Sequence, residues 1–153
     1  MDLDFVDATE ADLPEIVAMQ DDDFLSGGRE DTSEPLSPAY LDTLNTIQIM
    51  LNMRLIVAKH YGEFVGMLQI IFLQQFHYQG GKMCELESVR ISGKHRGKGL
   101  GHKLLGWCIE QAKAEVCRGV QLTSNDKRTD AIRFYKSLGF KDTHAGMKYS
   151  IEL

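Results

Sequence analysis

The 153-residue sequence has no long apolar run, no basic excess and few cysteines. A membrane-spanning helix needs about 20 consecutive apolar residues, and no stretch of the chain approaches that length. The opening residues, MDLDFVDATEADL, are acidic and lack the basic region and apolar core of a signal peptide, so we expect a cytoplasmic protein that does not contact membranes. The formal net charge of -5 argues against binding nucleic acid, because that function requires a basic surface.

The three cysteines, Cys84, Cys108 and Cys117, are odd in number and form no C-x-x-C pair. We therefore expect reduced, partly buried thiols rather than a disulfide framework. The five histidines lack the spacing of metal ligands, so the sequence predicts no metal site. The length and an apolar fraction of 43% are typical of one soluble domain, which we expect to cover residues 1–153.

The spacing of apolar residues predicts a mixed α/β fold without repeats or linkers. Alternating patterns predict strands at residues 3–8, 54–76 with a reversal at Gly62-Glu63, 82–91 and 118–124, and a closing hairpin at 140–153 around Ala145-Gly146. Helical spacing predicts helices at residues 9–20, 37–51, 101–116 and 129–138. Thr9 and Ser37 are suited to cap the first two helices, and Gly139 is suited to end the last one.

Residues 94–105, KHRGKGLGHKLL, place three alternating glycines among basic side chains, directly between a predicted strand and a predicted helix. The first turn of a helix has unpaired N–H groups and a partial positive charge, so it binds anions. Glycine lets the backbone approach a phosphate closely. The stretch therefore predicts a phosphate-binding loop in which Arg96 and Lys98 add charge. A glycine-rich connection with solvated side chains is the alternative interpretation.

Three phosphate-loop patterns can be compared with this stretch. A Walker loop requires G-x-x-x-x-G-K-[ST], and it fails because Gly97-Lys98 is followed by glycine. The dinucleotide pattern G-x-G-x-x-G fails at its last position, which is His102. The third pattern, [RQ]-x-x-G-x-[GA], is met by Arg96, Gly99 and Gly101. This is the pyrophosphate loop of the GNAT superfamily of acyl-CoA N-acyltransferases, which the sequence resembles.

A second motif lies about thirty residues further along the chain. The ending A-x-x-x-Y-x-x-x-G-F is met by Ala131, Tyr135, Gly139 and Phe140. The form TS…R-x-D-A-x-R-F-Y resembles the branch that contains the aminoalkylphosphonate acetyltransferases. The resemblance covers nearly the whole chain. It implies a GNAT-type fold with a central, mostly antiparallel twisted sheet, a splay between the fourth and fifth strands, and helices on both faces.

The resemblance also implies where acetyl-CoA binds as cosubstrate. The backbone of Val89 and Ile91, with Arg90 between them, pairs with the pantetheine arm, and the Val89 amide is the donor to the oxyanion. Arg128 or Asn125 contacts the pantetheine or the phosphates, although this helix entry departs from the family pattern. The residues that would bind the diphosphate are Arg96, Gly97, Lys98, Gly99, Leu100 and Gly101.

Three side chains are candidates for proton transfer by the same resemblance. Glu87, which we prefer, or Glu85 takes the proton of the amine, directly or through water. The two-residue period of a strand predicts that both carboxylates share a face with Val89. Tyr135 is the candidate acid that protonates coenzyme A. The alternatives are a solvated strand face for the glutamates and aromatic packing with Phe134 and Phe140 for Tyr135.

The sequence therefore predicts an acetyl-CoA-dependent N-acetyltransferase in which a small primary amine attacks the thioester directly in a ternary complex. A non-catalytic acyl-CoA-binding regulatory or interaction module is the alternative, and an exposed strand edge favours a homodimer. His77 and Tyr78 are expected in a strand turn near the acceptor mouth or on ordinary surface. An acidic loop would attract the amine or is simply solvated; its residues are Asp21, Asp22, Asp23, Glu30, Asp31 and Glu34.

Overall fold

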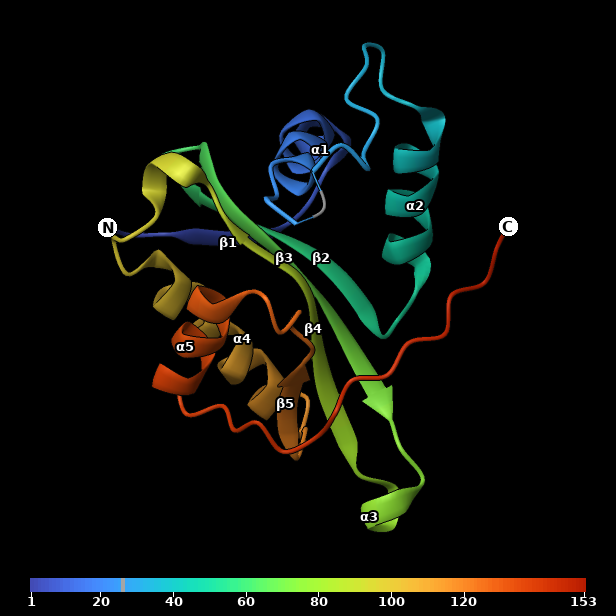
Figure 1. The fold of residues 1–153 in the computed structure, drawn as a ribbon, viewed down its shortest axis with the longest axis vertical. Helices are drawn as coiled ribbons and strands as arrows, with labels where there is room; N and C mark the ends of the chain where they lie inside the picture. Colours follow the sequence, from blue (N-terminus) through green and yellow to red (C-terminus); the bar gives the residue numbers. More distant parts are fainter. Residues whose placement is uncertain (26) are drawn as a thin grey trace. The chain divides into compact units, whose positions relative to one another are not determined.

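The structure, a computed structural model, describes residues 1–25 and 27–153 (Figure 1). They form two compact units, residues 1–121 and residues 122–153. The strands are β1 (Asp4–Asp7), β2 (Met53–His60), β3 (Glu63–Gln74), β4 (Lys82–Ile91) and β5 (Gly119–Leu122). The helices are α1 (Leu13–Asp21), α2 (Pro38–Ile49), α3 (His77–Gly80), α4 (Leu100–Ala114) and α5 (Thr129–Ser137), with 3₁₀ turns η1 (Glu10–Asp12) and η2 (Gly93–His95).

The five strands form one sheet in the order β1-β2-β3-β4-β5. The pairs β1–β2, β2–β3 and β3–β4 are antiparallel. Helices α1 and α2 cover one face of the sheet and α4 covers the other (Figure 1). The side chains of β2 point alternately to these two faces. Val57 packs with Leu13 of α1 on one face, and the Arg54 guanidinium lies over the Trp107 ring of α4 on the other. The predicted mixed α/β fold with helices on both faces is confirmed.

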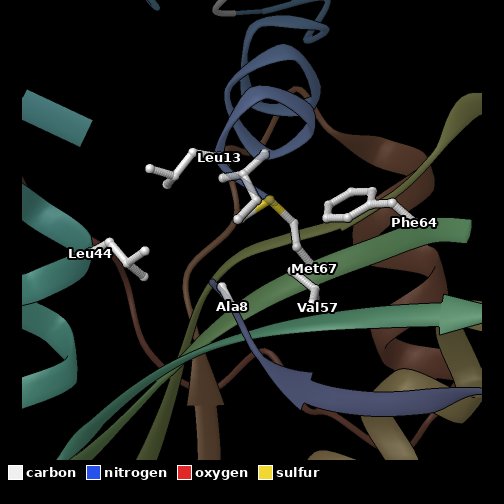
Figure 2. Close-up of a cluster of buried hydrophobic side chains, with 7 residues drawn as sticks. Ala8, Leu13, Leu44, Val57, Phe64 and Met67 are labelled. Carbon is white, nitrogen blue, oxygen red and sulfur yellow. The ribbon is translucent and has the colours of Figure 1, made fainter. Parts of the chain in front are cut away.

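On the face covered by α1 and α2, the core is formed by apolar side chains of these two helices and of the strands beneath them. Figure 2 shows Val57 and Met67 of the strands beside Leu13 of α1, with Leu44 of α2 facing the same cluster. Burial of such side chains supplies the main favourable free energy of folding. On the other face, α4 is fixed by an apolar side that is fully buried at Leu100, Leu104, Leu105 and Cys108.

The predicted helix start at Ser37 is confirmed, whereas Thr9 precedes the 3₁₀ turn η1 and α1 begins only at Leu13. The Thr9 amide donates to Asp12 Oδ2 at 2.9 Å, and the hydroxyl of Ser37 accepts from the Ala39 amide at 3.4 Å, with Pro38 at the first helical position. Gly139 follows α5 with a φ of 96°, the left-handed conformation expected of a glycine at that place. In the described residues, no helix is long and apolar enough to span a bilayer.

The hairpin expected at residues 140–153 is wrong. The Phe140 amide donates to the Tyr135 carbonyl at the end of α5, and no strand follows it in residues 141–153. A hairpin needs an apolar face that both arms contribute to. The first expected arm, FKDTH, offers a single large apolar side chain, so the second arm has no partner to pack with. The alternating pattern of residues 147–153 is therefore left unpaired within the described structure.

Candidate functional site

Strand β4 carries a bulge near its end. Ser88 and Val89 together stand opposite a single residue of β3, Leu68, and Ser88 has a φ of 54°. The left-handed conformation costs a non-glycine residue roughly 1 kcal/mol. A bulge bends a strand and turns backbone groups out of the ladder, which frees them for other partners. The bulge falls on Val89, whose amide is the predicted donor to the oxyanion.

The bulge also changes which side chains share a face. Glu87 pairs with Gln69 of β3, and Arg90 pairs with Met67, so Arg90 rather than Val89 lies on the face of Glu87. The expectation that Val89 shares a face with Glu85 and Glu87 is therefore wrong, since strict alternation ends at the extra residue. The face that carries both glutamates is the one that α1 and α2 cover.

Glu85 and Glu87 have different surroundings on this face. Glu85 is half-buried and accepts a hydrogen bond from the side-chain amide of Gln121 on β5. Glu87 is exposed and lies closer to the bulge. Glu87 is therefore open to an incoming molecule, whereas Glu85 already contacts a neighbouring strand.

Strand β5 accompanies only the first part of β4. The Arg118 amide donates to the Lys82 carbonyl at 2.8 Å, and the contact between Gln121 and Glu85 lies further on in the same direction along both strands. Strand β5 ends at Leu122, whereas β4 continues to Ile91. The bulged end of β4 thus extends past the end of β5, as the expected splay between these strands requires.

The glycine loop follows β4 and the 3₁₀ turn η2 and leads into α4. Gly97 and Gly99 have φ values of 74° and 75°, and α4 begins at Leu100, one residue before the predicted start. A Cβ atom added at either glycine would meet nothing within 4 Å, so conformation rather than space demands glycine here. Gly99 precedes the helix and has no side chain to cap it, so no side chain at that position competes with a ligand for the amides of Leu100 and Gly101.

The basic side chains of the loop divide into two groups. Lys98 is exposed, and Arg96 is exposed while its Nε donates to the Ile91 carbonyl at 3.2 Å. Lys94 of η2 forms an ion pair with Glu63 at the start of β3. Arg96 and Lys98 therefore remain beside the open amides, and together they form a cradle of positive potential suited to a phosphate.

A buried histidine that the sequence analysis did not single out holds the entry of this loop. His95 Nδ1 lies 3.0 Å from the Ser92 hydroxyl oxygen, and the Ser92 amide donates to the Val65 carbonyl at 2.9 Å. These contacts tie the loop to β3 before the glycines begin. The only sequence signal for this role was the serine three residues before the histidine.

Most of the acidic loop is structural. The Asp23 side chain is 1% exposed and pairs with Arg90 at 3.1 Å, which ties the loop to β4. Asp21 Oδ1 accepts from the Gly28 amide at 2.7 Å. Asp31 accepts from the Ser33 hydroxyl at 2.5 Å. Glu34 is exposed and lines a pocket of about 340 Å³ between α1 and residues 32–36.

The cysteines are free thiols, two of them buried. Burial raises the pKa of the Cys84 thiol to about 12 and also raises the pKa of Cys108. Burial likewise raises the pKa of Cys117. A thiol with a raised pKa is neutral near pH 7 and is a poor nucleophile. The described residues contain no group of three or more His, Cys, Asp or Glu that could hold a metal ion.

The second unit carries the other predicted residues. The Tyr135 ring on α5 lies 5.8 Å from the Phe140 ring and 5.4 Å from the Phe134 ring, so it takes part in aromatic packing. Arg128 precedes the first residue of α5. Asn125 Oδ1 accepts from the Lys127 amide at 2.9 Å, so its side chain organises its own turn.

The β3–β4 turn contains the two aromatic residues expected there. His77 and Tyr78 both belong to α3 and are exposed. The Arg118 guanidinium lies 3.8 Å from the centre of the Tyr78 ring, a cation–π contact. Tyr78 therefore packs against the residue that precedes β5, which fits the interpretation of ordinary surface placement.

Comparisons with known proteins agree with the motifs. The model of the Acetyltransferase (GNAT) family matches residues 15–140. An aminoalkylphosphonate N-acetyltransferase from Salmonella typhimurium is 34% identical over 89 residues, which are 58% of this chain and 56% of that protein. A histidine N-acetyltransferase from Oreochromis niloticus is 30% identical over 131 residues, 82% of this chain and 33% of that protein. The chain thus spans about half or less of the curated relatives that it matches.

Solved structures also resemble the chain over nearly its whole length, and one of them shares substantial sequence identity with it. It is a crystal structure described as a transcriptional regulator from Bacillus halodurans C-125, with 41% sequence identity and a TM-score of 0.93. The similarity covers 98% of this chain and 100% of that one.

Proposed function

The chain belongs to the acetyltransferase (GNAT) family, and from this we propose that it is an acetyl-CoA-dependent N-acetyltransferase acting on a primary amine of a small molecule. The observation that carries the proposal is the uncapped start of α4, where Gly97 and Gly99 expose amides beside Arg96 and Lys98 directly after a bulged strand. Both units would form one acetyltransferase domain over residues 1–153, a proposal supported by a family match that crosses their boundary.

Acetyl-CoA would bind as cosubstrate along the end of β4. The diphosphate would lie on the amides of Gly97 to Gly101, with Arg96 and Lys98 balancing its charge. The pantetheine arm would pair with the backbone of Val89 and Ile91, beside Arg90, as an added strand pairs with a sheet edge. Asn125 and Arg128 are proposed for the nucleotide end on the strength of the family motif.

The reaction would proceed by direct attack in a ternary complex. Glu87, or Glu85 in its place, takes a proton from the ammonium group, directly or through water, and the free amine forms a bond to the thioester carbonyl carbon. The Val89 amide donates to the oxyanion that develops. The carbon–sulfur bond then breaks as Tyr135 gives its proton to the sulfur. The nitrogen passes its second proton to the Tyr135 phenolate, directly or through water, so that a neutral amide and coenzyme A leave, and the glutamate returns its proton to solvent. The neutral thiols of Cys84 and Cys108 support a route without an acyl-enzyme.

The setting proposed for this reaction is the cytoplasm, with the chain acting as a homodimer. The direct test is a thiol-release assay with acetyl-CoA against polyamines, aminoglycosides, amino acids, aminophosphonates and lysine peptides. We expect turnover with at least one class. Failure with every class, despite tight binding of coenzyme A, would contradict the proposal.

The loop itself is tested by a pair of glycine variants. Gly99→Val places a β-branched residue where φ is 75°, so we expect it to weaken acetyl-CoA binding by more than about tenfold. Gly106→Ala is the matched control on α4, because a Cβ there meets nothing within 4 Å and the glycine has no positive φ. Isothermal titration calorimetry with coenzyme A distinguishes the two. Equal affinities would place the diphosphate elsewhere.

A second candidate function is a non-catalytic acyl-CoA-binding regulator. It is favoured by the Bacillus halodurans structure, which is described as a transcriptional regulator and is 41% identical to this chain. Both candidates share the glycine loop and differ at Glu87 and Tyr135. Coenzyme A binding without turnover, unaltered by changes at these two residues, would support the regulator.

A further inference from the structure

Residues 147–153, MKYSIEL, have the pattern of a strand without a partner. Their apolar side chains alternate with polar ones and are highly exposed, at 90% for Met147, 92% for Tyr149, 75% for Ile151 and 119% for Leu153. In the described structure, residues 141–153 take part in no backbone–backbone hydrogen bond. A segment with unpaired backbone groups and apolar side chains at alternate positions presents one apolar side when it extends, and it is then a template for pairing with another strand.

The segment is complementary to itself. If two copies run antiparallel with Ser150 opposite Ser150, Lys148 of each copy stands directly opposite Glu152 of the other. The same register places Met147 opposite Leu153 and Tyr149 opposite Ile151, with all of these apolar side chains on one face. Opposite charges and aromatic–β-branched pairs that face each other directly are the pairs that stabilise an antiparallel ladder.

Other registers lose this complementarity. A shift by one residue sets apolar side chains opposite polar ones across the ladder, because side chains alternate with a period of two. A shift by two residues sets Lys148 opposite Ser150 or Glu152 opposite Ser150, and the charge pairs are lost. The register centred on Ser150 is thus the one that pairs all seven residues and both charges.

We propose that residues 147–153 of two copies of this chain pair antiparallel about a two-fold axis at Ser150. The inference rests on the homodimer of the proposed function and names its interface, which is isologous because each copy offers the same surface. A two-stranded ribbon needs a cover for its apolar face. Helix α5 of the same unit, in which no residue is buried, is the element able to supply it.

Disulfide trapping tests the register. In Ser150→Cys the two new thiols face each other directly, with Cβ atoms about 4.5–5.5 Å apart. A shift of about 1 Å brings them within the Cβ separation of a disulfide, so mild oxidation with copper–phenanthroline should link the copies. In Glu152→Cys the two thiols are four positions out of register, too far apart for a bond. Wild type controls for Cys84, Cys108 and Cys117. We expect dimer on a non-reducing gel for Ser150→Cys only.

Charge reversal tests the same ladder without a covalent bond. Lys148→Glu or Glu152→Lys alone sets like charges opposite each other twice in the dimer, and we expect either to weaken dimerisation roughly tenfold or more. The double variant Lys148→Glu/Glu152→Lys restores opposite charges and should restore the affinity. Sedimentation velocity over a range of protein concentrations measures all four proteins.

The outcomes separate this inference from the acetyltransferase proposal, because neither measurement involves acetyl-CoA. Selective trapping of the Ser150→Cys variant, together with rescue by the double charge variant, supports the ladder. A monomer at all concentrations overturns both the homodimer and the ladder. A dimer that is insensitive to charge reversal, and that is trapped no faster in Ser150→Cys than in Glu152→Cys, overturns the ladder and keeps the homodimer.

Discussion

At the scale of single residues, Ser88 has the most unusual backbone in the site. Its φ of 54° makes the bulge that turns Val89 out of the β4 ladder. A β-branched residue tolerates this conformation worse than serine, whereas glycine adopts it freely. We expect Ser88→Val to lower the free energy of unfolding by about 1–2 kcal/mol and to lower kcat/KM, and Ser88→Gly to retain both. Urea unfolding and thiol release measure the two effects, and equal results for valine and glycine would show that the bulge is not needed.

The hydroxyl of Tyr135 separates its two interpretations. If it protonates coenzyme A, Tyr135→Phe lowers kcat by about 10²-fold, within the range for a general acid, while the affinity for coenzyme A stays nearly the same. If the ring only packs, the variant is silent. Phe140→Leu is the control, because it removes the ring that Tyr135 contacts and leaves the hydroxyl in place. Stopped-flow or steady-state thiol release measures kcat of each variant and so distinguishes a general acid at Tyr135 from a ring that only packs.

The two glutamates are expected to differ in effect. Glu87 is exposed near the bulge and Glu85 is held by Gln121, so Glu87→Gln should lower kcat/KM by about 10²-fold or more, the range for a general base. Glu85→Gln keeps the hydrogen-bonding shape and should have a smaller effect. A profile of kcat/KM against pH adds a readout that packing cannot change, because loss of the base removes the rise of the rate with pH. Similar profiles for Glu87→Gln and wild type would assign the base elsewhere.

The sequence predicted the backbone of the glycine loop better than that of β4. The glycine loop was predictable, since positive φ values at Gly97 and Gly99 are what alternating glycines provide. The bulge was not, because a serine at its left-handed position gives no signal in the sequence. Consequently Val89 was placed on the wrong face, while the shared face of Glu85 and Glu87, two residues apart before the bulge, was predictable from strand geometry.

At the scale of elements, Asp12 joins the start of α1 to the sheet. It accepts from the Thr9 amide and pairs with Lys59 of β2 at 2.7 Å, with its own side chain 8% exposed. Burial raises the pKa of Asp12, but the hydrogen bonds from Lys59 and Thr9 outweigh it and hold the pKa below its ordinary value. The charged carboxylate therefore stabilises the folded state.

This pairing predicts a pH-dependent stability. Because the folded pKa is depressed, the contribution is present above the unfolded pKa of about 4 and is lost as the pH falls through the folded value. We expect Asp12→Asn to lower the free energy of unfolding at pH 7 by about 1–3 kcal/mol, and the difference from wild type to shrink below about pH 4. Urea unfolding of wild type and Asp12→Asn at pH 7 and below about pH 4 measures this difference in the free energy of unfolding. A difference that is the same at both would exclude the ionised carboxylate as the cause.

Helices whose starts are marked by neighbouring residues were predictable, whereas the hairpin expected at residues 140–153 was not. Ser37 caps α2 as expected, and Thr9 and Asp12 contact each other at the turn that leads into α1, because such contacts depend on neighbouring residues alone. A hairpin at residues 140–153 depends on whether both arms find apolar contacts, which the alternation of one arm does not decide. Its failure leaves the exposed segment on which the proposed ladder depends.

At the scale of the whole molecule, the two units differ in how much they bury. The first unit, residues 1–121, contains the sheet and two apolar cores, whereas no residue from 122 to 153 is buried. Segments with little buried apolar surface open locally at a lower free energy than the global unfolding of the protein. The stability of this chain is therefore expected to be uneven along its length.

Hydrogen exchange tests this difference with two helices as a matched pair. Helix α4 buries Leu104, Leu105 and Cys108 against the sheet, and α5 buries no residue. We expect amides of α4 to exchange only on global unfolding and those of α5 to exchange through local opening, faster by at least about tenfold. Mass spectrometry of peptides from the two helices provides the rates, with β3 as a second reference for the core. If α5 were protected as strongly as α4, its side chains would have to be covered in solution by a partner such as the proposed ribbon, and sedimentation at the same protein concentration would then have to show a dimer.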